Sequence, residues 1–455
     1  MGAQAFCLRF TGILPVLIDR SKLASRMLAN RRQDVGAQFM KRKLLIVILG
    51  LIIVSQIPFA YRRYRLRRLR DTIQQLASQR VASPSESEFA DYQGAIHVHS
   101  SLGGHSTGNF AELIAAAKAN QLDFVIITEH PQQDFDTSAM TLSGIHAGIL
   151  FVNGNEAATS NGDRLLLIPG SPEAASDNTK TTQEVIDKQR STGGLSLAAY
   201  PADSQTWQTT SVDGVEVYNL FTNTRAINPA VMCFDGLWSY GSYPELMFAN
   251  FFARPTENLK RWDDAISVNN RKLVATSGND AHSNVGLSLN DASGKQWLGV
   301  KLDPYERSFR TVRTHVLIKK EKGLTRESLL EAIALGHCYV SFDLFGDARG
   351  FQFTAGAAET KIMGDDVANV IGLGLKASAP LNSRFMLLKD GNAVEQESGT
   401  TVNFPITLPG VYRVEVYLDS LPTPVKGQPW IISNPIYVRP ALQLDRARVQ
   451  ENSIK

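Results

Sequence analysis

The 455-residue sequence predicts an α/β fold that is preceded by one apolar helix and followed by a smaller all-β segment. Three observations lead to this prediction. Short apolar runs alternate with helical stretches from about residue 91 to 280. Residues 350–439 lack helical periodicity and offer short alternating runs between Gly, Pro and Asn turns. Residues 44–61 form the longest uncharged apolar run. A chain of this length exceeds what one core usually serves, so more than one domain is expected.

Charge is distributed unevenly along the chain. The first 80 residues contain 16 Lys/Arg and 3 Asp/Glu, whereas the remaining 375 contain 31 and 41. The net charge of +3 therefore comes from the N-terminal segment and is no argument for a nucleic-acid-binding body. The three cysteines, Cys7, Cys233 and Cys338, are far apart in the sequence and exclude a disulfide framework.

The apolar run at residues 44–61 reads LLIVILGLIIVSQIPFAY, and as a helix it would be roughly 27 Å long, against a bilayer core of about 30 Å. A buried core helix and a cleaved signal peptide are the alternatives. However, the run lacks a polar face, basic clusters flank it at 41–43 and 62–70, and no small-x-small cleavage site follows it. We therefore expect a single-pass membrane anchor. Because basic residues are nearly balanced on its two sides, the sequence leaves its orientation undecided.

Periodicity predicts the elements of the α/β segment in order. Residues 95–99 form a short strand, and residues 109–120 form a helix with Asn109 as its N-cap and Glu112 at the capping-box position. A continuous apolar strand, as expected in a sheet covered on both faces, follows at 124–127. Further strand candidates lie at 149–152, 165–168, 195–199, 215–217 and 273–275, and helical patterns lie at 181–190 and 257–268. About seven strands with interleaved helices predict a barrel-like parallel α/β fold.

Imidazole and carboxylate side chains recur where these strands end. His97 and His99 lie two residues apart on the first strand and are expected to project from the same face. The second strand runs into Thr128-Glu129-His130, the third ends in Asn153-Gly154-Asn155-Glu156, and the last ends in Ser277-Gly278-Asn279-Asp280-Ala281-His282. Parallel α/β barrels place their active sites at the carboxyl-terminal ends of the strands. We therefore predict that these side chains form one active site.

The motif set resembles that of the PHP (polymerase and histidinol phosphatase) metallohydrolase domain over residues 91–345, and more narrowly its carbaryl-hydrolase-like (CehA/McbA-type) branch. The resemblance implies a distorted (βα)7 barrel of the PHP type. It also implies catalytic roles for Glu156 and Asp280. The metal ligands that it implies are His97, His99, His105, His130, Glu156, Asp280 and His282.

In the family pattern, one metal ion is bound by His97, His99, Glu156 and Asp280, and a second by His105, His130 and His282. Such mixed imidazole and carboxylate ligation suits Zn²⁺, Mn²⁺ or Fe²⁺. Family members with three metal ions carry a histidine at the position of Tyr200 and another ligand near residues 215–219, where this chain has no histidine. We therefore expect two divalent ions. Tyr200 then either donates a hydrogen bond in the site or has a packing role.

The resemblance implies hydrolysis by a metal-activated water. Phosphoesters are the commoner substrates of the family, whereas carbamates or carboxylic esters belong to the named branch. Arg225 either binds an anionic part of the substrate or is a solvated loop charge, and Glu129 either supports the site or is a surface carboxylate. A metal-containing binding protein without turnover is the alternative from another class. The expected partners are a small-molecule ester and the membrane but no nucleic acid, and the resemblance favours an extracytoplasmic catalytic domain.

The sequence predicts a helix at 324–335 that ends at Gly336, and the all-β segment follows it. Alternating runs at 412–417 and 430–438 then predict a small antiparallel β-sandwich without histidine. Met40 offers a second translation start. The predicted domains in order are a basic N-terminal segment (1–43), a transmembrane anchor (44–61), a basic and then polar linker (62–90), the PHP-like domain (91–345), the β-sandwich (346–440) and a tail (441–455).

Overall fold

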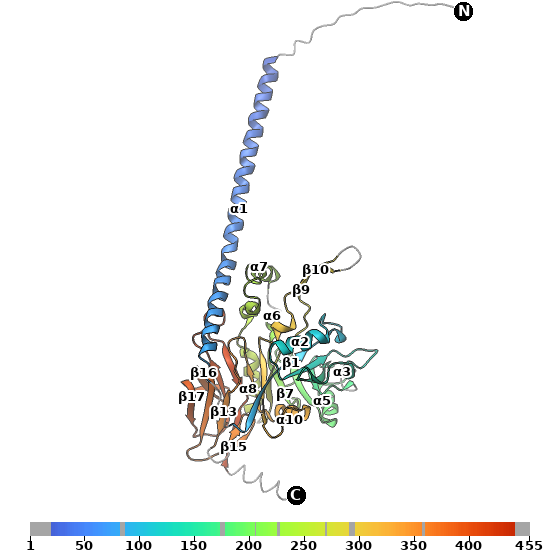
Figure 1. Ribbon diagram of the computed structural model, residues 1–455, viewed down its shortest axis with the longest axis vertical. Coiled ribbons are helices and arrows are strands. Elements are labelled where there is room, and N and C mark those ends of the chain that lie inside the picture. Colours follow the sequence, from blue (N-terminus) through green and yellow to red (C-terminus); the bar gives the residue numbers. More distant parts are fainter. Residues whose placement is uncertain are drawn as a thin grey trace, which may run out of the picture. The chain divides into compact units, whose positions relative to one another are not determined.

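A computed structural model of the protein describes residues 20–81, 87–172, 178–204, 206–224, 228–268, 271–290, 296–356 and 360–441 (Figure 1). The chain forms two units, residues 1–62 and 63–455. Helix α1 (Arg20–Ser78) contains the apolar run of the first unit. From Phe39 onward its mean hydropathy reaches 2.4, so by length and composition this helix is able to cross a membrane.

The second unit is a mixed α/β structure. Its first strands are β1 (Phe89–Val98), β2 (Phe124–Glu129), β3 (Gly144–His146), β4 (Ile149–Ala158), β5 (Arg164–Ile168), β6 (Leu195–Ala199), β7 (Gly214–Asn219), β8 (Val274–Gly278), β9 (Gly286–Asn290), β10 (Gln296–Lys301), β11 (Arg313–Lys319) and β12 (Cys338–Ser341). The helices among them are α2 (Phe110–Ala119), α3 (Thr137–Met140), α5 (Thr182–Ser191), α6 (Leu220–Thr224), α7 (Pro229–Ser239), α8 (Thr256–Ser267), α9 (Tyr305–Ser308) and α10 (Arg326–Leu335), with the 3₁₀ helices η1 (Ser101–Gly103) and η2 (Pro244–Phe251).

The sheet is mixed rather than wholly parallel, which corrects the sequence-based prediction. Strands β1, β2 and β4 pair in parallel, as do β6, β7 and β8. Strand β5, however, runs antiparallel to both β4 and β6. Only residues 159–163 connect β4 to β5, and a parallel pair needs a crossover of a dozen or more residues. The short connection therefore dictates a hairpin, which apolar periodicity alone does not reveal.

The predicted helix ends agree closely with the structure. Asn109 caps α2, since its side chain accepts a hydrogen bond from the backbone N–H of Glu112. Helix α10 begins with a capping box between Thr325 and Ser328 and ends at Gly336. Gly336 adopts the left-handed conformation (φ 77°) that closes a helix at low cost only for glycine. These caps fix where the chain leaves each helix and returns to the sheet.

The C-terminal strands continue the same sheet. Strand β12 pairs antiparallel with β19 (Pro429–Ser433), with Tyr339 opposite Ser433. Arg413 of β18 (Gly410–Tyr417) is buried and forms an ion pair with Asp263 of α8 at 2.7 Å. These contacts join the C-terminal strands to the α/β segment through one core. The strands are β13 (Gln352–Ala355), β14 (Lys361–Ile362), β15 (Asp366–Asn369), β16 (Gly374–Lys389), β17 (Asn392–Pro405), β18 (Gly410–Tyr417), β19 (Pro429–Ser433) and β20 (Ile436–Pro440).

Candidate metal centre

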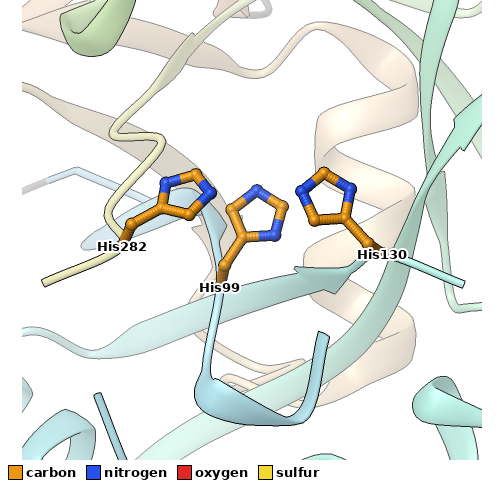
Figure 2. A group of neighbouring side chains, drawn as sticks. All are labelled: His99, His130 and His282. Carbon is orange, nitrogen blue, oxygen red and sulfur yellow. The ribbon is translucent and has the colours of Figure 1, made fainter. Parts of the chain in front are cut away.

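Three histidines from separate parts of the sequence form the middle of the site (Figure 2). His99 follows β1, His130 follows β2, and His282 lies four residues after β8. The imidazole of His99 lies between the other two, stacked on His130 with ring centroids 4.5 Å apart and on His282 at 4.3 Å. The ends of three strands thus converge, because β1 pairs in parallel with β2 and Val98 at the end of β1 forms a parallel bridge to Ala281 after β8.

Two buried carboxylates join these histidines to His97. Oε2 of Glu156 lies 3.3 Å from Nε2 of both His97 and His99 and 3.5 Å from Nδ1 of His130. Oδ1 of Asp280 lies 3.5 Å from His97, 3.6 Å from His99 and 3.4 Å from His282. Each carboxylate therefore faces three histidines.

The structure brings together the seven side chains that the sequence singles out, although not as two separate sets. His105 is the outermost, exposed, with its ring 4.7 Å from that of His130. The resemblance assigns Glu156 and Asp280 to the metal ion that His97 and His99 bind. In the structure each of them also contacts a histidine expected for the second ion, so both lie between the two expected groups of ligands. The two carboxylates therefore link the two expected groups of histidines.

The donor atoms fit metal ions. Both ring nitrogens of His99 and Oδ1 of Asp280 are buried without a hydrogen-bond partner among the residues that the structure describes. Buried polar atoms without partners are costly, and a bound cation satisfies such atoms. Two groups have ligand atoms mutually within 4.8 Å, namely His99 with His130 and His282, and His97 with His99 and Glu156. Nitrogen and carboxylate ligands together suit a transition metal.

Burial and mutual charge shift the protonation equilibria of the cluster. Burial alone would raise the pKa of Glu156, but the neighbouring imidazoles of His97 and His99 hold its pKa well below its usual range. Burial and the positive charge of His99 lower the pKa of His130 to about 3. His130 is therefore neutral at physiological pH and keeps a ring lone pair for a cation.

The backbone is strained where the site is built. His97, Tyr200 and Asp280 adopt left-handed conformations with φ of 64°, 48° and 47°. Such conformations are uncommon for residues other than glycine and concentrate at functional sites. At His97 the strain accompanies a bulge in the pairing of β1 with β2, between Ile96 and Val98. The two-residue alternation that predicts a shared face for His97 and His99 is therefore interrupted, yet both side chains are fully buried in the cluster.

Glu216 is a site residue that sequence reasoning missed. Its carboxylate is fully buried, and Oε1 lies 2.7 Å from Nδ1 of His97. Asn219 donates a hydrogen bond of 2.9 Å to the other oxygen. Gly278 faces this carboxylate, and a Cβ at that position would lie 1.4 Å from Glu216 Oε1. The available signal was a single carboxylate in the otherwise apolar strand around Val215, since a lone buried charge needs a partner.

Tyr200 and Glu129 occupy defined positions near the cluster. The hydroxyl of Tyr200 donates a 2.6 Å hydrogen bond to Oδ2 of Asp280. Glu129 is fully buried and accepts hydrogen bonds from the backbone N–H and hydroxyl of Ser100, so it is not a surface carboxylate. Burial raises the pKa of Glu129. Arg225 lies outside the described residues.

A cleft of about 1160 Å³ opens onto the cluster. Its lining includes His105, His130 and His282 together with Glu156 and Asp280. The side chains of the cluster are therefore accessible from the cleft. The remaining walls include Tyr200, Arg164, Asn178, Asp203 and Phe221.

Comparison with models of protein families and with curated proteins gives no match. Several solved structures are similar. A two-domain protein from Bacteroides vulgatus that contains a predicted PHP-like metal-dependent phosphoesterase is 14% identical, over 78% of this chain and 98% of its own, with a TM-score of 0.35. PsfC from Pseudomonas syringae is 13% identical, over 56% and 92%, with a TM-score of 0.37. These similarities are distant.

The expectation that excluded nucleic acid is corrected by two further structures. The lesion-specific endonuclease EndoQ from Pyrococcus furiosus is 13% identical, over 60% of this chain and 64% of its own, with a TM-score of 0.33. Another structure shows endonuclease Q with a 27-mer duplex substrate that carries an abasic lesion, at 13% identity over 53% and 56% and a TM-score of 0.31. The net charge of a chain does not exclude a nucleic-acid substrate in a cleft.

Proposed function

We propose that this chain is a metal-dependent hydrolase of the PHP type that acts on phosphoesters. One observation carries the proposal: Glu156 and Asp280 are buried, each lies within 3.6 Å of three histidines, and both ring nitrogens of His99 have no hydrogen-bond partner among the described residues. Divalent cations bind such a concentration of nitrogen and carboxylate ligand atoms well. The cleft of about 1160 Å³ supplies access for a substrate.

The proposed ligands are the seven residues of the cluster, with Glu156 and Asp280 shared between two ions of Zn²⁺, Mn²⁺ or Fe²⁺. When bound, such ions lower the pKa of a coordinated water and stabilise negative charge on the substrate oxygens. His130 is suited to this ligation because its low pKa keeps it unprotonated. His105 is the exposed member and completes the outer side of the cluster.

The other residues orient the ligands. Glu216 accepts a hydrogen bond from Nδ1–H of His97, which leaves Nε2 of that ring free to face Glu156 and Asp280. Tyr200 donates to one oxygen of Asp280 and leaves the other directed at the histidines. We propose that Tyr200 occupies the side of the site where a third ion would need a histidine, so that two ions bind.

We also propose the finer architecture. The strands from β1 to β12 correspond to a distorted (βα)7 barrel at residues 91–345, and β13 to β20 correspond to a β-sandwich at 346–440. The apolar run at 44–61 would anchor the protein in a membrane, which its length and hydropathy support. Protease-protection experiments on membrane vesicles would decide whether the α/β domain lies on the cytoplasmic or the extracytoplasmic side.

The direct test is hydrolysis by the full-length protein in detergent with Mn²⁺ or Zn²⁺. The substrates are bis(p-nitrophenyl) phosphate, p-nitrophenyl phosphate and p-nitrophenyl acetate, and the variant is Asp280→Ala. We expect metal-dependent turnover of a phosphoester that the variant loses. Turnover of the acetate alone would favour a carboxylic ester or carbamate substrate. Absence of turnover on all three, with metal bound, would favour a binding protein.

A further inference from the structure

We propose that Arg164 binds the anionic group of the substrate, so that the cleft selects phosphoesters over neutral carbamates and carboxylic esters. This inference rests on the proposed hydrolase function and specifies the substrate class of the same site. Arg164 matches no sequence motif, and its position follows only from the strand register and the lining of the cleft.

The sheet places Arg164 at the mouth of the site. It is the first residue of β5 and pairs with Ala158 of β4 and Ala199 of β6, and all three line the cleft. Glu156 lies two residues before Ala158 on the same strand, so its side chain projects from the same face. Antiparallel pairing of β5 therefore brings a guanidinium beside a metal-binding carboxylate.

Arg164 lies beside the ligand cluster, on the far side of the Glu156 carboxylate from the histidines. Nη1 of Arg164 lies 3.8 Å from Oε1 of Glu156, while Oε2 of the same carboxylate faces His99 at 3.3 Å. One carboxylate thus separates the guanidinium from the ligand atoms. A tetrahedral anion can place one oxygen at the cluster and another at Arg164, and the planar guanidinium fork is the side chain best matched to phosphate oxygens.

The charges of the cleft support a role beyond neutralising Glu156. Among the described residues that line the cleft, Arg164 is the one arginine or lysine, whereas Glu156, Asp203 and Asp280 are acidic. Its side chain is 45% exposed, and its contact with Glu156 is a single approach at 3.8 Å. Because the guanidinium is half-exposed and lies as far as 3.8 Å from the buried carboxylate, this contact contributes little to stability, so folding alone gives little reason for an arginine there. An anionic substrate would otherwise meet an acidic wall.

The test uses the full-length protein in detergent, loaded with Mn²⁺, with Arg164→Met, Arg164→Lys and the control Arg326→Met. Arg326 is an exposed residue of α10 outside the cleft. For Arg164→Met we expect kcat/KM on bis(p-nitrophenyl) phosphate to fall about 10- to 100-fold, because the variant loses one or two charge-assisted hydrogen bonds to the substrate. We expect a change below about threefold on p-nitrophenyl acetate. The kcat/KM of Arg164→Lys on the phosphodiester should lie between those of the wild type and Arg164→Met, because lysine keeps the positive charge but not the planar guanidinium.

Binding of inorganic phosphate, measured by calorimetry, gives a readout that needs no turnover. We expect Arg164→Met to weaken it about tenfold or more and Arg326→Met to leave it unchanged. Unchanged phosphate affinity in Arg164→Met, or equal losses on the phosphodiester and the acetate, would overturn the inference. If the wild type hydrolyses none of the esters, the proposed function fails, and phosphate binding still decides the role of Arg164.

Discussion

Replacement of Glu216 by glutamine tests whether this buried carboxylate positions a metal ligand. Glutamine keeps the size of the side chain and can still turn its oxygen toward Nδ1–H of His97. Its NH₂ group would then face Nδ2 of Asn219, which now donates to Glu216 at 2.9 Å. Asn219 cannot reverse its amide at no cost, because its Oδ1 accepts a hydrogen bond from the backbone N–H of Thr222. Either orientation of the glutamine therefore leaves two donors opposed.

The expected cost falls on metal affinity. Loss of a carboxylate that orients a metal-binding histidine typically weakens binding about 10- to 100-fold, or about 1.4 to 2.7 kcal/mol. Zn²⁺ affinity would be measured by competition with a chromogenic chelator, after the full-length protein has been stripped of metal. Glu257→Gln, at an exposed position of α8, is the matched control. An affinity of Glu216→Gln within about twofold of the wild type would refute the positioning role.

Three further predictions concern the surroundings of the site and the core. Gly278→Ala would place a Cβ 1.4 Å from Glu216 Oε1 and displace this carboxylate, so we expect metal affinity to fall at least as far as in Glu216→Gln. An unchanged affinity would contradict the close packing of Gly278 against Glu216. Tyr200→Phe removes one hydrogen bond to Asp280, worth about 1 kcal/mol, so kcat should fall several-fold. Elemental analysis should show an unchanged metal content. Loss of the metal would contradict a role for Tyr200 that is limited to this hydrogen bond. Burial alone would raise the pKa of Glu415, but its two arginine partners outweigh it and lower the pKa to about 2. Its stabilising contribution is therefore complete above the ordinary glutamate pKa and is lost as pH falls toward 2, and Glu415→Gln should lower the melting temperature at pH 7 and flatten its decline in acid.

The sequence predicted what depends on local pattern. Apolar runs located the strands that carry His97 and Glu156, and Asn109 and Gly336 marked helix ends, because caps act through their own neighbours. Recurring histidines at strand ends indicated convergence, since parallel strands share an edge. The structure brings those side chains to one place, and Figure 2 shows three of them in a row.

Features that depend on pairing between distant segments were not predicted. The antiparallel direction of β5, which brings Arg164 to the cleft, follows from a short connection rather than from periodicity. The partner of His97 is Glu216, 119 residues further along the chain, and no motif joins them. The bulge at His97 and the left-handed conformation of Asp280 arise from tertiary packing that overrides local preference.

The metal content of the full-length protein, measured by elemental analysis after purification without chelators, tests the cluster most directly. Two equivalents of a transition metal per chain are expected, falling sharply in Asp280→Ala. Less than about half an equivalent in the wild type after incubation with Zn²⁺ or Mn²⁺ would contradict a metal centre. Three equivalents would contradict the inference that Tyr200 closes the side of a third ion.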